Sequence, residues 1–241
     1  MWKNFFMATN MEKLQLDNSN FRYERKFFIY NLNRFAVESI ILQHPAFFHE
    51  IFHERYVNNI YFDFFQFNNY HDNVIGNTDR IKYRIRWYEN LLAEIEKPIL
   101  ELKIKKGIVG TKQLYSLNKF NLSSGFNISE IKNVINDSLI DSQVKFSLQD
   151  QFPVMINRYR RKYYETFDKK FRITIDDNQT FYKLSNFNNT LLNKQEDNDN
   201  VVLELKYDKK YQHETEQITN YLPFRLTKSS KYTRGIELLY N

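Results

Sequence analysis

The sequence of 241 residues contains no cysteine, five glycines and four prolines. The absence of cysteine excludes disulfide bonds and thiolate metal sites. The mean hydropathy is -0.65, and no unbroken apolar run reaches the roughly 18 residues of a membrane-spanning helix. The apolar patch near the N-terminus is shorter than a signal-peptide core and lacks a small-residue cleavage site. We therefore expect a cytoplasmic protein with no membrane span.

Two common nucleotide-binding motifs are also missing, because the sequence contains neither G-x-x-x-x-G-K-[ST] nor G-x-G-x-x-G. A nucleotide, if bound, is not held in the manner of a P-loop or a Rossmann fold. The formal net charge of +6 and the pI near 9.2 nevertheless indicate an anionic partner. No internal repeat or linker divides the chain. We expect a weakly ordered leader over residues 1–19 and one domain over residues 20–241.

What the sequence does contain is a strand with cations on one face. Residues 80–87 read Arg-Ile-Lys-Tyr-Arg-Ile-Arg-Trp, so Arg80, Lys82, Arg84 and Arg86 share one face and apolar residues share the other. A solvated sheet face would explain one such strand, but similar alternation recurs at residues 21–27, 100–105, 171–176 and 202–207. Five such strands predict an α+β fold with a closed antiparallel barrel, a charged lumen and an exterior covered by helices.

Turn residues and apolar spacing predict the remaining elements. Helices are expected over residues 31–42, 47–54, 129–148 and 211–220, and further strands over residues 56–62, 112–117, 153–164 and 227–239. Residues 68–79 are expected to form a turn, and residues 186–200 a polar loop.

One short motif suggests a zinc protease. Residues 49–53 read His-Glu-Ile-Phe-His, which matches H-E-x-x-H. The extended zinc-protease pattern fails, because Tyr56 replaces the required glycine and Asn59 replaces the third histidine. Apolar neighbours such as Phe48 and Phe52 instead favour a short packing helix with the His and Glu side chains turned outward.

Eight motifs resemble, in order, those of the VTC (vacuolar transporter chaperone) catalytic domain. They are Tyr23–Phe27, Val57–Asp63, Arg84–Tyr88, Leu100–Lys103, Tyr159–Arg161, Arg172–Asp176, Leu203–Lys206 and Ser230–Tyr232. This family belongs to the triphosphate tunnel metalloenzymes, alongside the CYTH phosphatases and RNA triphosphatases. The resemblance implies an eight-stranded antiparallel tunnel. We expect a stand-alone, bacterial-type VTC domain without the phosphate-sensing and membrane regions of the eukaryotic polymerases.

The resemblance also implies roles for individual residues. The phosphate clamps that it implies are Lys26, Arg84, Arg86, Lys103, Arg161 and Arg172. The further substrate-binding residues are Lys112, Lys206, Lys228 and Lys231, with the last two at the tunnel mouth. Glu204 would hold Mn²⁺ or Mg²⁺, with Glu24 and Glu101 as the next candidates. Arg158, Arg160, Arg161 and Lys162 crowd together, so alternation does not decide which faces inward, although the Tyr-x-Arg match favours Arg161.

Three functions fit these residues. The first is a polyphosphate polymerase that uses ATP, the second is a hydrolase of inorganic or organic triphosphates, and the third is a non-catalytic polyphosphate binder. The run of cations along the whole tunnel leads us to place the polymerase first. A membrane-protein partner in trans is compatible with this function. Nucleic acid is not expected as a partner, because Tyr83 and Trp87 lie on the face opposite the cations instead of among them.

Overall fold

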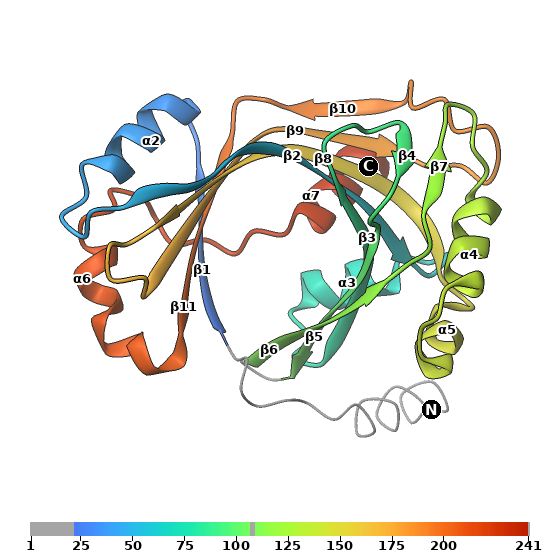
Figure 1. Cartoon of the computed structure of the whole chain (residues 1–241), viewed down its shortest axis with the longest axis horizontal. Helices are drawn as coiled ribbons and strands as arrows, with labels where there is room; N and C mark the ends of the chain where they lie inside the picture. The colour runs from blue at the N-terminus through green and yellow to red at the C-terminus, as the bar shows by residue number, and fades with distance from the viewer. Residues whose placement is uncertain (1–21, 107–108, 241) are drawn as a thin grey trace.

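The computed structural model describes residues 22–106 and 109–240 as an α+β fold around one large antiparallel sheet (Figure 1). The strand order is β1-β11-β9-β8-β2-β3-β5-β6, and β10 pairs with β9. The strands are β1 (Arg22–Ile29), β2 (His49–Asp63), β3 (Arg80–Tyr88), β5 (Ile99–Lys106), β6 (Val109–Ser116), β8 (Phe152–Glu165), β9 (Phe171–Lys183), β10 (Lys194–Asp197) and β11 (Val201–Asp208). A separate small sheet pairs β4 (Ala93–Ile95) with β7 (Phe120–Leu122).

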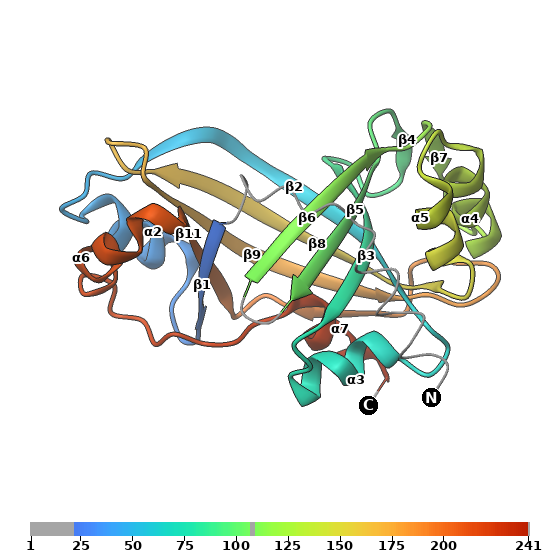
Figure 2. The ribbon, with the colours of Figure 1, turned by 90° about the horizontal axis from the view of Figure 1, so that it is seen from below.

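The large sheet curls into a half-barrel, which brings its end strands β1 and β6 near each other (Figures 1 and 2). Within the described ranges these two strands do not pair, so the expected closure by backbone hydrogen bonds is not found. A side-chain contact spans the seam instead, because Lys103 Nζ lies 2.9 Å from Glu24 Oε2. The backbone N–H of Thr227 also donates to the carbonyl of Lys26 at 2.8 Å, which covers part of the edge of β1.

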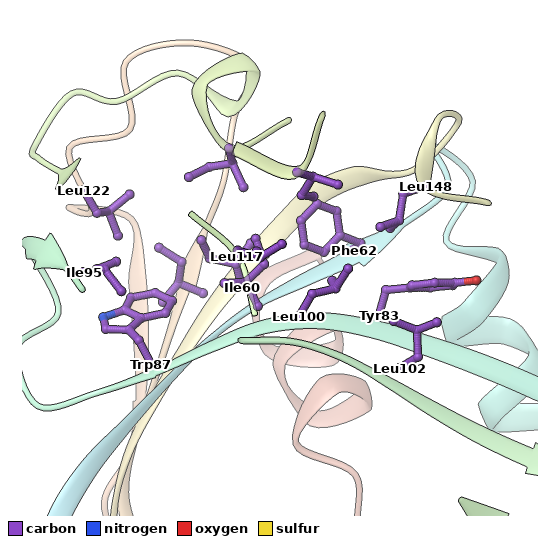
Figure 3. Packing of buried hydrophobic residues seen from close by; sticks show 14 of the residues in the cluster. Ile60, Phe62, Tyr83, Trp87, Ile95, Leu100, Leu102, Leu117, Leu122 and Leu148 are labelled. Atoms are coloured by element: carbon purple, nitrogen blue, oxygen red, sulfur yellow. The ribbon is translucent and has the colours of Figure 1, made fainter. Parts of the chain in front are cut away.

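Helices cover the convex face of the sheet. The helices over one half are α2 (Arg34–Leu42), the 3₁₀ helix η2 (Lys209–Glu214) and α6 (Thr215–Thr219), and those over the other half are α4 (Ile128–Asp137) and α5 (Ser142–Leu148). Leu148 of α5, for example, packs in one buried cluster with Ile60, Phe62 and Leu100 of the sheet (Figure 3). Burial of these apolar side chains stabilises the curled sheet from outside and leaves its concave face free for polar residues.

Helix α7 (Lys231–Tyr240) packs against the concave side of the sheet, beside α3 (Asn68–Ile75) (Figure 2). Tyr232 and Ile236 of α7 share a buried cluster with Met155 and Phe181. A Cβ atom on Gly235 would lie 2.6 Å from Met155 Sδ and from a ring carbon of Phe181, so glycine permits this close approach. The predicted final strand over residues 227–239 is therefore wrong, since the apolar residues of this segment repeat with helical spacing.

Three further predictions differ from the structure. The H-E-x-x-H motif lies on strand β2 and not on a helix, because residues 49–63 form one long strand that pairs with β8 through several β-bulges. Its two histidines therefore lack the one-turn spacing of a zinc helix. Helix α3 and strand β10 occupy segments that were expected to be a turn and a loop. The predicted helices over residues 31–42 and 129–148 are confirmed, whereas the predicted leader lies outside the described residues.

No helix in the two described stretches is long and apolar enough to cross a membrane.

Candidate functional site

Strand alternation sorts the side chains of β3 onto the two faces of the sheet. Tyr83 and Trp87 belong to the buried cluster under α4 and α5 (Figure 3), whereas Arg84 and Arg86 form ion pairs on the concave face. The same rule applies to β1, β5, β8, β9 and β11. Their inward side chains give a lumen lined by charged groups, and their outward side chains form the apolar core.

Glu204 of β11 is surrounded by cations of the lumen. Its Oε1 atom is 3.0 Å from Lys26 Nζ, and its Oε2 atom is 2.8 Å from Lys206 Nζ. The Nη2 atom of Arg161 approaches Oε2 to 3.6 Å. Burial alone would raise the pKa of Glu204, but Lys206, Lys26, Lys231 and Arg161 outweigh this effect and hold the pKa well below its ordinary value. Glu204 is therefore a buried carboxylate that stays ionised because cations surround it.

Asp176 of β9 forms a second cluster with cations from two other elements. Arg161 donates from Nε and Nη2 to the two carboxylate oxygens at 2.5 and 2.6 Å. Lys231, the first residue of α7, donates from Nζ to Oδ2 at 2.5 Å. The ring of Tyr159 lies beside both cations, 5.1 Å from Arg161 Cζ and 4.6 Å from Lys231 Nζ. Asp176 and Tyr159 were not among the expected site residues, although each belongs to one of the quoted motifs.

The opposite wall is organised around Glu101 of β5. Arg84 Nη2 lies 2.5 Å from Glu101 Oε1, and Arg86 Nη1 lies 3.3 Å from Oε2. Burial opposes the charge of this carboxylate, but Arg84 and Arg86 lower its pKa. Arg84 also donates to the hydroxyl of Tyr61 at 3.2 Å, and Arg86 donates to Asn59 Oδ1 at 3.1 Å. Both guanidinium groups are held in place by neighbours from β2 and β5.

Lys82 differs from these residues because no carboxylate pairs with it in the described part of the chain. Its Nζ atom lies 3.1 Å from Ser230 Oγ and 5.6 Å from the centre of the Tyr232 ring. Burial, followed by repulsion from Arg80, Lys103, Lys26 and Arg84, lowers its pKa well below the ordinary lysine value. Alternation placed Lys82 on this face, but the family motif that supplied the candidate residues begins at Arg84.

The other predicted cations lie nearer the edges of the lumen. Lys103 of β5 bridges the seam to Glu24, with half of its side chain exposed. Lys112 stands opposite Lys103 on β6. Arg172 lies at the end of β9, where it is 52% exposed and donates from Nε to Glu165 Oε1 at 2.7 Å. Lys228 is exposed, and its charge contributes to a lowered pKa of Lys105.

The crowded cations of β8 separate onto the two faces of the sheet. Arg161 faces the lumen. Arg160 pairs with Asp177 on the other face, and Arg158 stacks on the ring of Tyr56 with Cζ 3.9 Å from its centre. Period-two alternation therefore holds along β8, and the register irregularity opposite Arg158 and Arg160 is taken up by the extra residue in β9.

Of the three predicted metal ligands, Glu24 and Glu204 lie together and Glu101 lies apart from them. Both residues contact Lys26 and Lys206, so two carboxylates lie side by side in the lumen. Such hard oxygen ligands suit Mg²⁺ or Mn²⁺. Glu101 pairs with Arg84 and Arg86 on the opposite wall, and neither arginine is shared with another carboxylate in the described ion pairs. The described residues contain no group of three or more acidic or histidine side chains that could hold a metal, so ligand oxygens would have to complete the coordination.

The comparisons with known proteins agree with this architecture. The family model of the VTC domain matches residues 21–240. No curated protein matches the sequence. A candidate adenylyl cyclase from Hippeastrum, described as having a dominant triphosphatase activity, is similar in structure. The TM-score is 0.51 at 12% sequence identity, and the match covers 89% of this chain and 96% of that chain. A candidate adenylate cyclase from Vibrio parahaemolyticus gives a TM-score of 0.49, 11% identity, and coverage of 90% and 98%. At such low identity the Hippeastrum comparison shows a shared fold, and the match over residues 21–240 shows that the chain belongs to the VTC domain family.

Proposed function

We propose that this protein is a metal-dependent phosphotransferase that acts on triphosphates and builds inorganic polyphosphate from ATP. The observation that carries the proposal is the excess of cations over carboxylates on the concave face. Four carboxylates that line the lumen, Glu24, Glu101, Asp176 and Glu204, are engaged by cations, yet Lys82 remains without an acidic partner in the described chain. A bound polyphosphate chain would supply the missing negative charge.

The residues of the lumen are suited to phosphoryl transfer. This reaction depends mainly on positioning the phosphates and neutralising their charge. Arg84, Arg86 and Arg161 can grip phosphate oxygens with two N–H donors each, whereas Lys26 and Lys206 act as point charges. Glu24 and Glu204 would hold Mn²⁺ or Mg²⁺, which would neutralise phosphate charge when bound.

The extent of the cationic track favours a polymerase, because a long anionic chain needs favourable contacts beyond the reacting phosphate. Arg172 lies at one end of the sheet, and Arg80, Lys105 and Lys228 gather at the other. Burial, followed by repulsion from Arg80 and Lys228, lowers the pKa of Lys105. Cations therefore continue past the N-terminus of α7 along strands β3 and β5.

A triphosphatase is the second candidate, and α7 is the observation that favours it. Tyr232 and Ile236 close part of the concave face against Met155 and Phe181 with an apolar contact. A pocket closed at one end suits a short triphosphate with water as the nucleophile, whereas a growing polymer needs a second opening.

Incubation of the purified protein with ATP and Mn²⁺ or Mg²⁺ tests these alternatives. A ladder on a gel stained for polyphosphate supports the polymerase, and free phosphate without a ladder supports the triphosphatase. Intact ATP together with tight polyphosphate binding would indicate a non-catalytic binder. The matched variants are Arg84→Ala and Arg86→Ala in the lumen, which should lose triphosphate binding, and Arg158→Ala on the convex face, which should keep it. Unchanged triphosphate affinity in the two lumen variants would contradict the proposal.

A further inference from the structure

Aromatic side chains and one arginine gather at the end of the sheet opposite α7. This mouth cluster consists of Phe52 and Arg55 of β2, Tyr88 of β3 and Tyr163 of β8. Arg55 Cζ lies 4.2 Å from the centre of the Tyr88 ring and 4.9 Å from that of Tyr163, and its Nε donates to the Tyr163 hydroxyl at 3.1 Å. Phe52 meets Tyr163 edge to face, with ring centroids 5.7 Å apart.

The mouth cluster continues the faces that line the lumen. Tyr88 follows Arg86 by two residues on β3, and Tyr163 follows Arg161 by two residues on β8. Arg55 is the cross-strand partner of Arg161. Two residues of a strand span roughly 7 Å, which is a distance that a ribose can bridge. A group attached to phosphates held by Arg86 and Arg161 would therefore reach this cluster.

The rings of the mouth cluster remain accessible. Phe52 is 55% exposed and Tyr88 is 37% exposed, whereas Tyr159, which lies deeper in the lumen, is 1% exposed. The backbone that carries Tyr88 is held in place, because the N–H of the next residue, Glu89, donates to the carbonyl of Tyr56 at 3.0 Å. Fixed, exposed aromatic rings beside a guanidinium group form a stacking surface that does not depend on hydrogen bonds to a particular base.

Arg55 adds a charge that the described protein does not balance. It forms no ion pair with a carboxylate there, and its contacts are the three aromatic rings and the Tyr163 hydroxyl. A ligand with an aromatic ring next to a chain of phosphates would match both properties of the cluster. An inorganic triphosphate would leave the aromatic rings unused.

We propose that the mouth cluster binds the nucleobase of a nucleoside triphosphate whose phosphates occupy the lumen. This inference rests on the proposed function and specifies its substrate class. The aromatic rings would then favour the binding of a nucleoside triphosphate over that of an inorganic triphosphate. The cations of the lumen would hold the phosphates of both ligands.

The test compares the binding of ATP with that of inorganic triphosphate by calorimetry. Replacing both exposed rings, in the double variant Phe52→Ala with Tyr88→Ala, should weaken ATP binding roughly tenfold, the loss expected for stacking of one base. Inorganic triphosphate binding should change less than about twofold, because both rings lie beyond the cations that hold the phosphates. Tyr88→Phe keeps the ring and should bind ATP like the wild type. Phe187→Ala removes a more exposed ring in the β9–β10 connection, outside the mouth cluster, and serves as the control.

Each outcome separates this inference from the proposed function. A selective loss of ATP affinity in the double variant supports the nucleobase site. Equal losses for the two ligands, or no loss for either, would overturn the nucleobase site without contradicting the proposed function. A wild-type protein that binds neither ligand would overturn the proposed function and the nucleobase site together.

Discussion

Arg160 and Arg161 are consecutive residues of β8, and each pairs with one of two consecutive aspartates of β9. On the convex face, Arg160 Nη2 lies 2.5 Å from Asp177 Oδ2. On the concave face, Arg161 Nε lies 2.5 Å from Asp176 Oδ1. The two ion pairs have the same chemistry and nearly the same geometry, so any difference in their roles must come from what surrounds them.

The surroundings differ in charge balance. The convex pair joins Arg34 and Glu54, which also form an ion pair with each other, so two cations face two carboxylates. The concave pair joins Lys231 and Glu204, and from there it continues into a lumen with more cations than carboxylates. A cluster with balanced charge leaves no net charge for a ligand to neutralise, whereas a surplus of one sign creates a site for a ligand of the opposite sign.

The largest expected effect separates the two arginines directly. Arg161→Ala should weaken the binding of inorganic triphosphate roughly 10- to 100-fold, because it removes charge-assisted hydrogen bonds to the ligand. Arg160→Ala should leave that affinity within about twofold, because its partners lie on the other face. Calorimetry on both purified variants measures the difference, after circular dichroism has shown that each one folds. Similar losses of triphosphate affinity in the two variants would show that the two arginines do not differ in their roles.

The next comparison concerns two carboxylates that face opposite sides. Glu204→Gln should retain triphosphate binding but lower Mn²⁺-dependent turnover by at least about tenfold, because the amide keeps the shape and removes the charge that a divalent ion needs. Glu54→Gln, in the convex cluster, should turn over like the wild type. Turnover and affinity are measured at the same Mn²⁺ concentrations. Wild-type turnover in Glu204→Gln would move the metal site away from this residue.

Lys82 and Lys162 allow a smaller and more specific comparison. The pKa of Lys82 lies well below its ordinary value because of burial and neighbouring cations, whereas Glu38 and Glu50 outweigh burial and raise the pKa of Lys162. A bound triphosphate would raise the pKa of Lys82, so binding should take up a proton, and affinity should fall as the pH rises above the lowered pKa of the free protein.

Calorimetry in buffers of different ionisation enthalpy detects this proton uptake. Lys82→Met should abolish the part of the uptake that belongs to this residue, and Lys162→Met should leave it unchanged. Proton uptake of wild-type size in Lys82→Met would show that another group titrates when the ligand binds.

The smallest effect is expected at the seam of the sheet. Lys103 is 51% exposed, and its ion pair with Glu24 joins the two sides of the half-barrel. Lys103→Ala should lower the free energy of unfolding by no more than about 1 kcal/mol, since exposed ion pairs contribute little to stability. Urea unfolding measures this value. A loss of several kcal/mol would mean that the side-chain bridge is essential for holding the half-barrel together.

Local patterns in the sequence predicted most of the sheet but failed at several segments, two of which show the physical reason. Residues 80–87 and 202–207 form strands as their alternation indicated, because period-two patterning identifies the buried face without knowledge of the partner strand. Residues 49–54 were expected to be helical and instead extend β2, since a short apolar segment is decided by the strand with which it pairs. Residues 227–239 were expected to form a closing strand, but Lys231–Tyr240 form helix α7, whose buried residues Tyr232, Gly235 and Ile236 follow helical spacing.

The sequence by itself determined that cations would share one face of several strands, since strand alternation is a local property of the backbone. Only the tertiary structure decided which cations carry an unbalanced charge. Arg160 and Arg161 differ because of partners that are distant in the chain, such as Glu54 and Lys231. Ion pairing depends on distances across strands and on a helix packed against the concave face, and neither is encoded in the spacing of residues along a single strand.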